Sequence, residues 1–598
     1  MTGTDDDDAM AAPEPPLAAL LSGAAQPAPP PQKPSAGQRA AWRLTLVGAA
    51  FAFGFSAVAV RMAALALSEP VEPQVAAGET ALHVARAEIT DRAGRPLAMN
   101  LPAASVYAHP GEIDDPARAA RLLAETLSGV DEARLRARFE RRRGFAWIKR
   151  PISPGERQAV HDLGLPGVYF GDRDVRAYPA GRIAAHVLGG ARAGDEGVRG
   201  AEIIGLAGAE RWSDETLRDP ARAGAPLRLS IDLPAQAALT EVLEEARARL
   251  GAKGAWATLM DARTGAIAAM VSLPDFDPNR RPDPADPRVA ADARLRNRAV
   301  EGVYEFGSAF KPFFAALALE RGVIGMDTLI DAKGPVVWGR ARFRDHYPMP
   351  PQMTVAQIMA KSSNVGTIRM ALMAGTAAAQ DFLRKLGMMA PTGLDLAEAR
   401  LGQPLAPQRW SDLSTITISF GYGLSVSQTH MAAGYAALVN GGLLVTPTLN
   451  PDAGPPGEAA RVISARTSAQ MRAILRGVVE GGTGRSAEAP GYLVGGKTGT
   501  ANKLSRTGRG YDETRTLATF AGAFPMNDPR YVLIVTLDEP TDRSGPKPRR
   551  TAGATAAPTA GAAIRRLAPL LGLRPALPDP APEPAPQPAA ALAAAVRG

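Results

Sequence analysis

The chain has 598 residues with 60 glycines, 53 prolines, no cysteine and a formal net charge of +8. The lack of cysteine excludes disulfides, thiolate metal sites and a cysteine nucleophile, and the six histidines never fall at metal-ligand spacing, which argues against a zinc hydrolase. The basic residues are scattered, with neither a basic stripe nor interleaved aromatic residues, so we expect a solvated surface and no nucleic-acid partner.

The N-terminal part predicts a cytoplasmic tail and a membrane anchor. Residues 1–43 begin with an acidic run and continue as Ala/Pro-rich sequence, which is typical of a disordered tail. Residues 44–67 are apolar except for Arg61 and are long enough to span a bilayer. Basic residues precede this segment and two glutamates follow it, so the positive-inside bias places the tail in the cytoplasm and the rest outside. A cleaved secretory signal and a buried core helix are the alternatives, which the long leader and the lack of a polar face disfavour.

Residues 68–225 are predicted to form a separate domain, which we call the pedestal. The segment is rich in Arg and Gly. A strand-like run at residues 87–90 leads into a turn at residues 91–95, and a charged helical stretch covers residues 116–143. We find no catalytic constellation here.

Residues 226–570 are the predicted catalytic domain. Buried-looking strands alternate there with apolar helices, so a mixed α+β fold is expected. The strands are residues 256–260, 266–271, 517–524 and 531–537, the last two forming a hairpin, and the helices are residues 312–319 and 431–438. Residues 571–598 are Ala/Pro-rich again and predict a second disordered tail.

A Ser-x-x-Lys motif opens one of the apolar helices. Residues three apart share a helix face, so the Lys311 ammonium can reach the Ser308 hydroxyl. Pro312 is compatible with the first helical turn, where backbone N–H groups have no internal partner. The positive end of the helix would favour an alkoxide on Ser308.

Two further motifs follow in order. Ser362 and Asn364 offer a hydroxyl and an amide two residues apart. Lys497, Thr498, Gly499 and Thr500 follow residues 493–496, which we interpret as a strand of an antiparallel sheet, and the glycines would let a ligand backbone approach closely.

Lysine is rare in this chain, with ten among 68 basic residues, yet three lie in or beside these motifs. A lysine can lose its proton near another cation, whereas an arginine cannot. Each motif alone is common, as a helix cap or a surface turn. All three in this order predict a serine acyl-transfer site.

These motifs resemble those of class B penicillin-binding proteins, most of all the division-specific, FtsI-type D,D-transpeptidases. The resemblance covers residues 86–567. Further matching segments are residues 91–94, 176–181, 185–189, 230–232, 273–279, 297–300, 419–423, 440–442 and 553–558. It implies a transpeptidase domain, with an antiparallel sheet flanked by helices, after an elongated, dimerisation-type pedestal and one transmembrane helix. It implies no cofactor and no metal.

The resemblance also implies roles for the site. Ser308 would be the acylated nucleophile, Lys311 its proton acceptor and Ser362 a proton relay to the leaving group. Asn364 would bind the substrate amide, and Lys497 would lower the pKa of its neighbours and orient the substrate carboxylate. The residues that would line the carboxylate end are Thr498, Gly499 and Thr500, and the backbone N–H groups of Ser308 and Thr500 would form the oxyanion hole.

Two positions depart from the family pattern. Phe306 stands where proline is usual before Gly-Ser, and Ala87 where glycine is usual in the first domain. Phe306 is therefore expected to loosen the turn that presents Ser308. His186 and His430 are interpreted as packed or surface side chains and not as ligands.

Division-specific cross-linking of peptidoglycan is the leading hypothesis, with D-Ala-D-Ala stem peptides as donors, an amine on a neighbouring stem as acceptor and β-lactams as acylating inhibitors. An elongation-specific relative generally carries Asp at the position of Asn364. A serine β-lactamase has no use for an anchor and pedestal, and a silent sensor or scaffold has no need of two lysines beside a serine. The resemblance implies an inner-membrane protein with an extracytoplasmic catalytic domain at the septum and partners that include an FtsW-type glycan polymerase.

Overall fold

The computed structural model describes residues 36–67, 86–141, 144–193, 203–222, 224–282, 289, 292–457, 460–505 and 510–576. The chain divides into two units, Met1–His83 and Val84–Gly598. Disordered tails were expected at residues 1–43 and 571–598, of which residues 1–35 and 577–598 lie outside the described residues. Residues 571–576 are described, and the Ala576 N–H donates to the Gly491 carbonyl oxygen at 2.8 Å.

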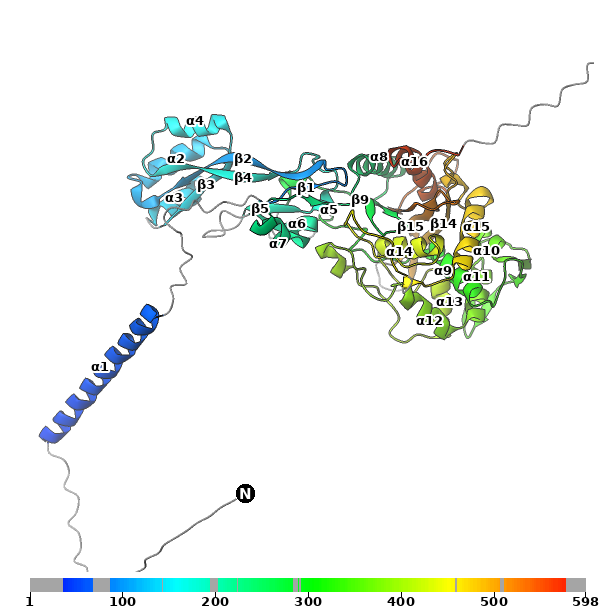
Figure 1. Cartoon of the computed structure of the whole chain (residues 1–598), viewed down its shortest axis with the longest axis horizontal. Helices are drawn as coiled ribbons and strands as arrows, with labels where there is room; N and C mark the ends of the chain where they lie inside the picture. Colours follow the sequence, from blue (N-terminus) through cyan, green and yellow to red (C-terminus); the bar gives the residue numbers. More distant parts are fainter. Residues whose placement is uncertain are drawn as a thin grey trace, which may run out of the picture. The chain divides into compact units, whose positions relative to one another are not determined.

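The described element of the first unit is the helix α1 (Ala36–Leu67), coloured blue in Figure 1. It begins before the predicted apolar segment, so residues 36–43 are helical and were wrongly assigned to the disordered tail. The strong helix formers Ala, Gln and Arg account for this extension. Among helices of the described residues, none combines the length and the apolar character that crossing a membrane requires.

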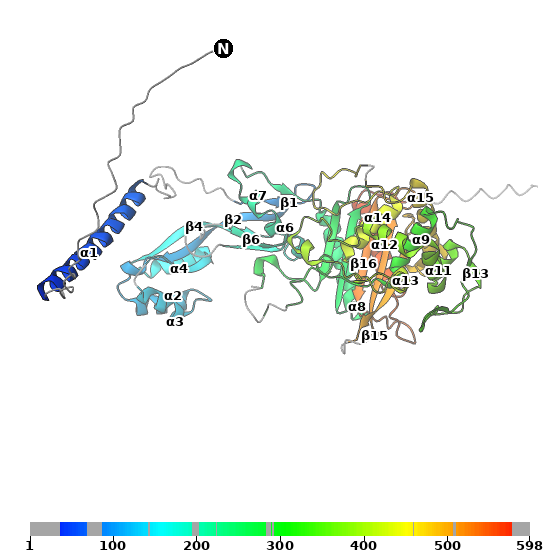
Figure 2. The same ribbon diagram turned by 90° about the horizontal axis from the view of Figure 1, so that it is seen from below.

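The pedestal is built on a long antiparallel pair of strands, β2 (Pro96–Ala108) and β4 (Val168–Ala177), which Figures 1 and 2 both show side by side. β3 (Ala146–Ile152) pairs with β2 on its other edge. β1 (Ile89–Thr90) pairs antiparallel with β2 and parallel with β7 (Leu227–Arg228). β5 (Gly190–Ala193) and β6 (Ile203–Ala207) form a separate hairpin.

Short helices complete the pedestal. Those near the C-terminal half of β2, from residue 104 onward, share one apolar core with this strand. The pedestal helices are η1 (Pro110–Glu112), α2 (Pro116–Thr126), α3 (Glu132–Glu140), α4 (Pro154–Asp162), α5 (Ala185–Leu188), α6 (Gly208–Trp212), α7 (Asp214–Arg218) and η3 (Pro220–Arg222). The helical stretch expected over residues 116–143 is two helices. Gly129, at a φ of 78°, separates them, and the Asp131 side chain caps the second.

The pedestal contains a buried ion cluster centred on Glu210 of α6. The Glu210 carboxylate has no exposed surface and accepts hydrogen bonds from Arg86 and Arg176, each at 2.7 Å. Tyr178 donates its hydroxyl to the same carboxylate at 3.2 Å. Arg176 and Tyr178 belong to a family-like motif in the sequence, and this cluster gives the motif a structural reason.

The catalytic sheet has the order β14, β15, β16, β8, β9, and every neighbouring pair is antiparallel. The strands are β14 (Gly495–Leu504), β15 (Tyr511–Phe524), β16 (Tyr531–Asp538), β8 (Gly254–Asp261) and β9 (Ile267–Leu273). β8, β9 and β16 are buried along almost their whole length because helices cover both faces of the sheet.

The helices form two layers around this sheet. α8 (Leu233–Leu250) and α16 (Ala556–Leu570) pack together on one face, and α14 (Gln428–Val439) covers the other face with α9 (Lys311–Glu320) and α15 (Ala465–Gly481) (Figure 1). Further helices lie beyond α9, namely α10 (Val355–Lys361), α11 (Asn364–Ala374), α12 (Thr376–Lys385) and α13 (Asp412–Ser419). The remaining short elements are η4 (Pro278–Arg280), η5 (Gly307–Phe310), η6 (Ala397–Leu401), η8 (Arg485–Ala487), β10 (Ile330–Asp331), β11 (Val336–Trp338), β12 (Ala341–Phe343) and β13 (Gln352–Met353).

The mixed helix and sheet architecture and the predicted hairpin, β15 and β16, are confirmed. The predicted bounds of one strand were wrong. β14 begins at Gly495 and includes the whole Lys-Thr-Gly-Thr motif, whereas the strand was expected to end before it. Leu493 has a φ of 41°, outside the extended region, so the strand cannot begin there.

Candidate active site

Ser308 lies in a 3₁₀ turn that packs against the edge strand of the catalytic sheet. The turn is η5, and the α-helix α9 starts only at Lys311. The expected helix opening is thus a tighter turn, but residues three apart are also aligned in a 3₁₀ helix. Ser308 and Lys311 therefore keep a common face.

Glycine at position 499 permits the close approach of η5 and β14. A Cβ atom on Gly499 would lie 2.2 Å from the Phe306 carbonyl oxygen and 2.7 Å from the Ala309 nitrogen. Gly307 faces the same strand, with a φ of 52° and the position of its missing Cβ 2.7 Å from the Thr500 carbonyl oxygen. The nucleophile turn and the Lys-Thr-Gly-Thr motif are consequently in backbone contact.

Two lysines from distant parts of the sequence meet at Ser362. Lys311 Nζ donates to the Ser362 carbonyl oxygen at 2.5 Å and lies 3.3 Å from Ser362 Oγ. Lys497 Nζ donates to Ser362 Oγ at 2.9 Å and to the Thr498 carbonyl oxygen at 3.0 Å. The three motifs predicted to converge are therefore together in the structure.

The electrostatic environment favours the neutral form of both amines. Lys311 and Lys497 have no exposed surface. Burial lowers the pKa of Lys311 well below its ordinary value, the charge of Lys497 lowers it further, and Asp345 opposes the shift. Burial alone lowers the pKa of Lys497 to about 7. A lysine with such a pKa can accept a proton at neutral pH, which no arginine could do.

Ser362 occupies the joint between two helices. It ends α10 with a φ of 61°, a left-handed conformation that is uncommon for a residue other than glycine. Ser363 then caps α11 by accepting the Gly366 N–H at 3.0 Å. The left-handed backbone at this position directs the Ser362 hydroxyl toward the amino groups of Lys311 and Lys497.

Asp345 is a site residue that sequence reasoning missed. Its carboxylate accepts the Ser363 hydroxyl at 2.8 Å, the Val365 N–H at 3.2 Å and the Asn364 N–H. A carboxylate at the first turn of a helix is stabilising, and this one holds the Ser-x-Asn motif in place. No motif marks Asp345, since it lies in a loop well before the segment that it caps.

The residues expected to bind substrate surround this centre. Asn364 donates its side-chain amide to the Arg344 carbonyl oxygen at 3.0 Å. Thr498 donates its hydroxyl to the Thr483 hydroxyl at 2.9 Å, and the Thr500 hydroxyl accepts the Ala552 N–H at 2.9 Å. Both threonine hydroxyls keep unused lone pairs.

Ser308 is half-buried. Within the described part of the chain, its hydroxyl makes no hydrogen bond to Lys311, whose ammonium points to Ser362 instead. Catalytic hydrogen bonds are often long before substrate binds, so this geometry is compatible with proton transfer from Ser308.

Phe306, which stands where proline is usual, is packed in the core and is 1% exposed. Its ring lies 6.1 Å from that of Tyr304. The segment before Ser308 is also fixed by Glu305, which accepts the Gly423 N–H at 2.6 Å and the Tyr511 hydroxyl at 3.0 Å. The loosening expected from the missing proline is therefore offset by packing and hydrogen bonds.

The two histidines are packed, as expected. His186 Nε2 hydrogen-bonds the Arg294 carbonyl oxygen at 2.7 Å, and burial lowers its pKa to about 4. His430 bonds Ser427 and the Ala390 carbonyl oxygen, each at 2.7 Å. His430 thus has both ring nitrogens in structural contacts, and His186 has Nε2 in one.

Family models match most of the chain. Residues 255–565 match the penicillin-binding protein transpeptidase domain, and residues 81–221 match the penicillin-binding protein dimerisation domain. The first match contains all three motifs, and the second covers most of the pedestal.

Curated relatives agree with these models. A probable peptidoglycan D,D-transpeptidase FtsI of Caulobacter vibrioides is 36% identical over 82% of each chain. The peptidoglycan D,D-transpeptidase FtsI of Escherichia coli K12 is 30% identical over 82% of this chain and 84% of its own length. A crystal structure of penicillin-binding protein 3 from Mycobacterium tuberculosis, complexed with aztreonam, is 26% identical with a TM-score of 0.61, over 83% of this chain and 97% of its own length. The chain therefore belongs to the class B penicillin-binding proteins, as an FtsI-type peptidoglycan D,D-transpeptidase.

Proposed function

We propose that this chain cross-links septal peptidoglycan by acyl transfer through Ser308. The Ser308 oxygen attacks the carbonyl carbon of the penultimate D-Ala of a stem peptide, the amide C–N bond breaks, and the terminal D-Ala leaves with a proton. An amine on a neighbouring stem then attacks the ester, which forms the new amide and restores the hydroxyl. The observation that carries this proposal is the pair of buried lysines on Ser362, of which Lys311 lies one turn from Ser308.

The pKa shifts of the two lysines indicate which groups accept and donate protons. Lys311, neutral because it is buried beside a second cation, accepts the proton of Ser308. Ser362, hydrogen-bonded to both lysines, passes a proton to the departing amine. The charged fraction of Lys497 attracts the substrate carboxylate, beside the hydroxyls of Thr498 and Thr500.

Asn364 and the backbone hold the substrate in place. The Asn364 amide faces the stem-peptide backbone, while the N–H groups of Ser308 and Thr500 stabilise the oxyanion. Close packing of η5 on β14 supports this role, because it brings the backbones of these two segments together. Preorganised donors of this kind contribute about 3 to 4 kcal/mol each to transition-state stabilisation.

The test is mass spectrometry of the full chain after incubation with a penicillin. The expected result is one long-lived adduct on Ser308, absent from Ser308→Ala. An adduct of equal amount in Ser308→Ala would refute the assignment, and rapid release of the opened drug would indicate a β-lactamase.

Membrane attachment through residues 44–67 belongs to this proposal. No charged residue occurs in residues 44–60, and the side chains of Phe51, Phe53 and Phe55 are exposed on α1. Exposed aromatic side chains of this kind favour a lipid environment. We expect the protein to remain in membrane pellets after carbonate washing, and Phe51→Arg with Phe53→Glu to release it.

The domain arrangement is also part of the proposal. Residues 68–225 act as the pedestal of an extracytoplasmic catalytic domain, residues 226–570, at the division septum of the inner membrane. An FtsW-type glycan polymerase is the expected partner, on the analogy of FtsI-type proteins. Imaging of fluorescent-penicillin labelling at midcell tests the placement, and co-purification with the polymerase tests the partner.

A further inference from the structure

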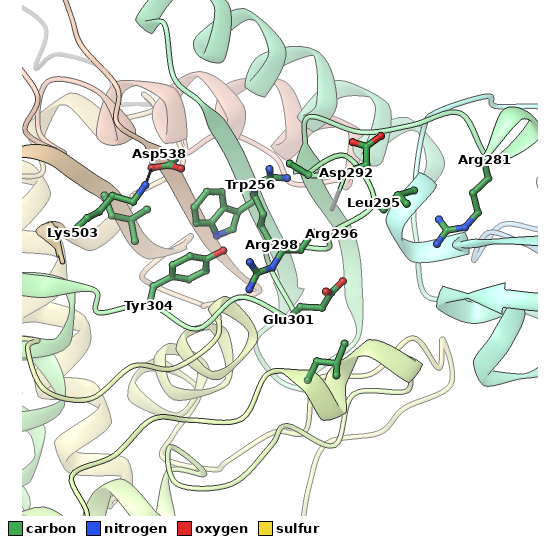
Figure 3. Close-up of a pocket in the computed structure, with 13 residues that line it drawn as sticks. Trp256, Arg281, Asp292, Leu295, Arg296, Arg298, Glu301, Tyr304, Lys503 and Asp538 are labelled. Atoms are coloured by element: carbon green, nitrogen blue, oxygen red, sulfur yellow. Dashed lines mark hydrogen bonds and ion pairs between the residues drawn. The ribbon is translucent and has the colours of Figure 1, made fainter. Parts of the chain in front are cut away.

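A second cavity, of about 770 Å³, lies outside the catalytic centre (Figure 3). Its walls come from β8, β15, η6, Arg281, residues 292–304 and the ends of β14 and β16. Ser308, Lys311, Ser362 and Lys497 do not line it. The volume is in the range of cavities that bury a drug-sized ligand.

The cavity wall contains nitrogen donors without acceptors. Trp256 is only 1% exposed, yet its indole N–H has no hydrogen-bond partner among the described residues. A buried guanidinium nitrogen of Arg298 and one of Arg281 are unpartnered as well. Figure 3 labels Trp256, Arg296, Arg298 and Tyr304 beside one another on one wall of the cavity. Buried donors of this kind cost free energy unless an acceptor reaches them.

The acidic residues of the wall do not neutralise Arg298. Asp538 forms an ion pair with Lys503 at 2.5 Å, and Asp292 forms one with the exposed Arg294. Glu301 accepts the Asn297 N–H at 2.8 Å, and burial raises its pKa. Burial is the main cause that lowers the pKa of Arg298; the charge of Asp538 opposes the shift, but Arg298 forms no ion pair with it or with another carboxylate among the described residues.

These features select the chemistry of a ligand. A guanidinium and an indole N–H together match a planar carboxylate, whose oxygens accept several hydrogen bonds. The nearby carboxylates would repel a dianionic phosphate more strongly than a monoanion. One carboxylate oxygen of Glu301 has no hydrogen-bond partner among the described residues and can accept from an N–H group. The leucines at 295, 401 and 517 give the cavity apolar surface. A carboxylate, an N–H group and an apolar body are what a short peptide combines.

We propose that this cavity is a second, non-catalytic binding site for a carboxylate-bearing peptide. Arg298 and Trp256 bind the carboxylate, and Glu301 accepts an N–H of the peptide. The inference rests on the proposed function only for the choice of a stem-peptide analogue as its source.

The test uses the full chain in detergent with Ser308 already acylated by a penicillin, so that the catalytic centre is closed. The probe is diacetyl-L-Lys-D-Ala-D-Ala, which has a single carboxylate, titrated by calorimetry beside its C-terminal amide. We expect saturable binding of the acid, at least about tenfold weaker binding of the amide, and a similar loss in Arg298→Gln, since hydrogen bonds to charged groups have this magnitude. Arg249→Gln is the matched control, because Arg249 is an exposed arginine on α8 that does not line the cavity, and it should bind as the wild type does.

Two more variants keep the outcome independent of folding defects. Arg298→Lys retains the charge and should bind more tightly than Arg298→Gln, and Trp256→Phe retains the ring but loses the N–H and should weaken binding. Absence of saturable binding at millimolar peptide, or equal affinity of Arg298→Gln and wild type, would overturn the proposal. Displacement of the peptide by equimolar inorganic phosphate would overturn the carboxylate assignment. If Ser308 is not acylated at all, the proposed function fails, while the titration remains decisive on Ser308→Ala.

Discussion

Replacing Lys497 with methionine should stabilise the protein while it slows acylation. Methionine has a similar shape and no charge, so it removes an ammonium group that burial disfavours. The fall of the Lys497 pKa from 10.5 to about 7 corresponds to about 5 kcal/mol of unfavourable burial, of which about 4 kcal/mol is present at pH 7.5. The two hydrogen bonds to Ser362 and Thr498 are lost, at about 1 kcal/mol each. The net gain is about 2 kcal/mol, a rise of several degrees in Tm.

The pH dependence of this gain has a defined sign. Between pH 7 and 10.5 the unfolded chain binds a proton on Lys497 that the folded chain does not bind, so wild-type stability rises with pH in that window. Lys497→Met lacks this contribution. Its advantage should therefore be largest at and below pH 7 and should shrink toward pH 10.

The acylation rate gives a second readout. The charge of Lys497 lowers the pKa of Lys311, so Lys497→Met should raise that pKa and shift the rising limb of the acylation profile to higher pH. Stopped-flow labelling with a fluorescent penicillin from pH 6 to 10, together with thermal unfolding over the same range, measures both effects. A lower Tm at every pH, or an unshifted profile with normal rates, would refute the electrostatic account of the site.

Three other substitutions test separate parts of the structure. Asp345→Asn removes the anionic cap of α11 and should lower the acylation rate about tenfold while Tm falls by only a few degrees; an unchanged rate contradicts the positioning role. Gly499→Ala drives a Cβ into the Phe306 carbonyl and should abolish penicillin labelling, whereas Gly477→Ala, with open space around it, should leave labelling intact. Glu210→Gln leaves the buried Arg176 without a charge partner and Arg86 with Asp214 alone, and should cost about 3 to 5 kcal/mol in urea unfolding; a loss below 1 kcal/mol would show that the cluster contributes little.

The Ser-x-x-Lys part of the site could be predicted from the sequence because its two residues are close together in the chain. Ser308 and Lys311 are three residues apart, and any helical turn brings them to one face. The hairpin of β15 and β16 was visible as two apolar runs around a short turn. The alternation of strands and helices also gave the fold class.

Partnerships between distant segments could not be predicted in the same way. Asp345 contacts Ser363 across β13 and α10, and Glu210 on α6 pairs with Arg86, which precedes β1, and with Arg176 on β4; no spacing rule connects these residues. The strand β14 was misplaced because its motif reads as a turn, with a glycine that weakens strand propensity. That glycine is required by the packing of η5 on the strand, which is a tertiary contact.

The choice of lysine over arginine at this centre links stability to function. Lys311 and Lys497 form no ion pair with a carboxylate among the described residues, so their burial opposes folding at neutral pH. The nearest compensation is indirect, through Asp345, which raises the pKa of Lys311 without contacting it. A carboxylate in direct contact would stabilise the ammonium form and remove the proton acceptor that Ser308 needs. The carboxylate of Asp345 instead caps α11, where it positions the Ser-x-Asn motif without contacting Lys311. Lys311 therefore remains able to take up a proton.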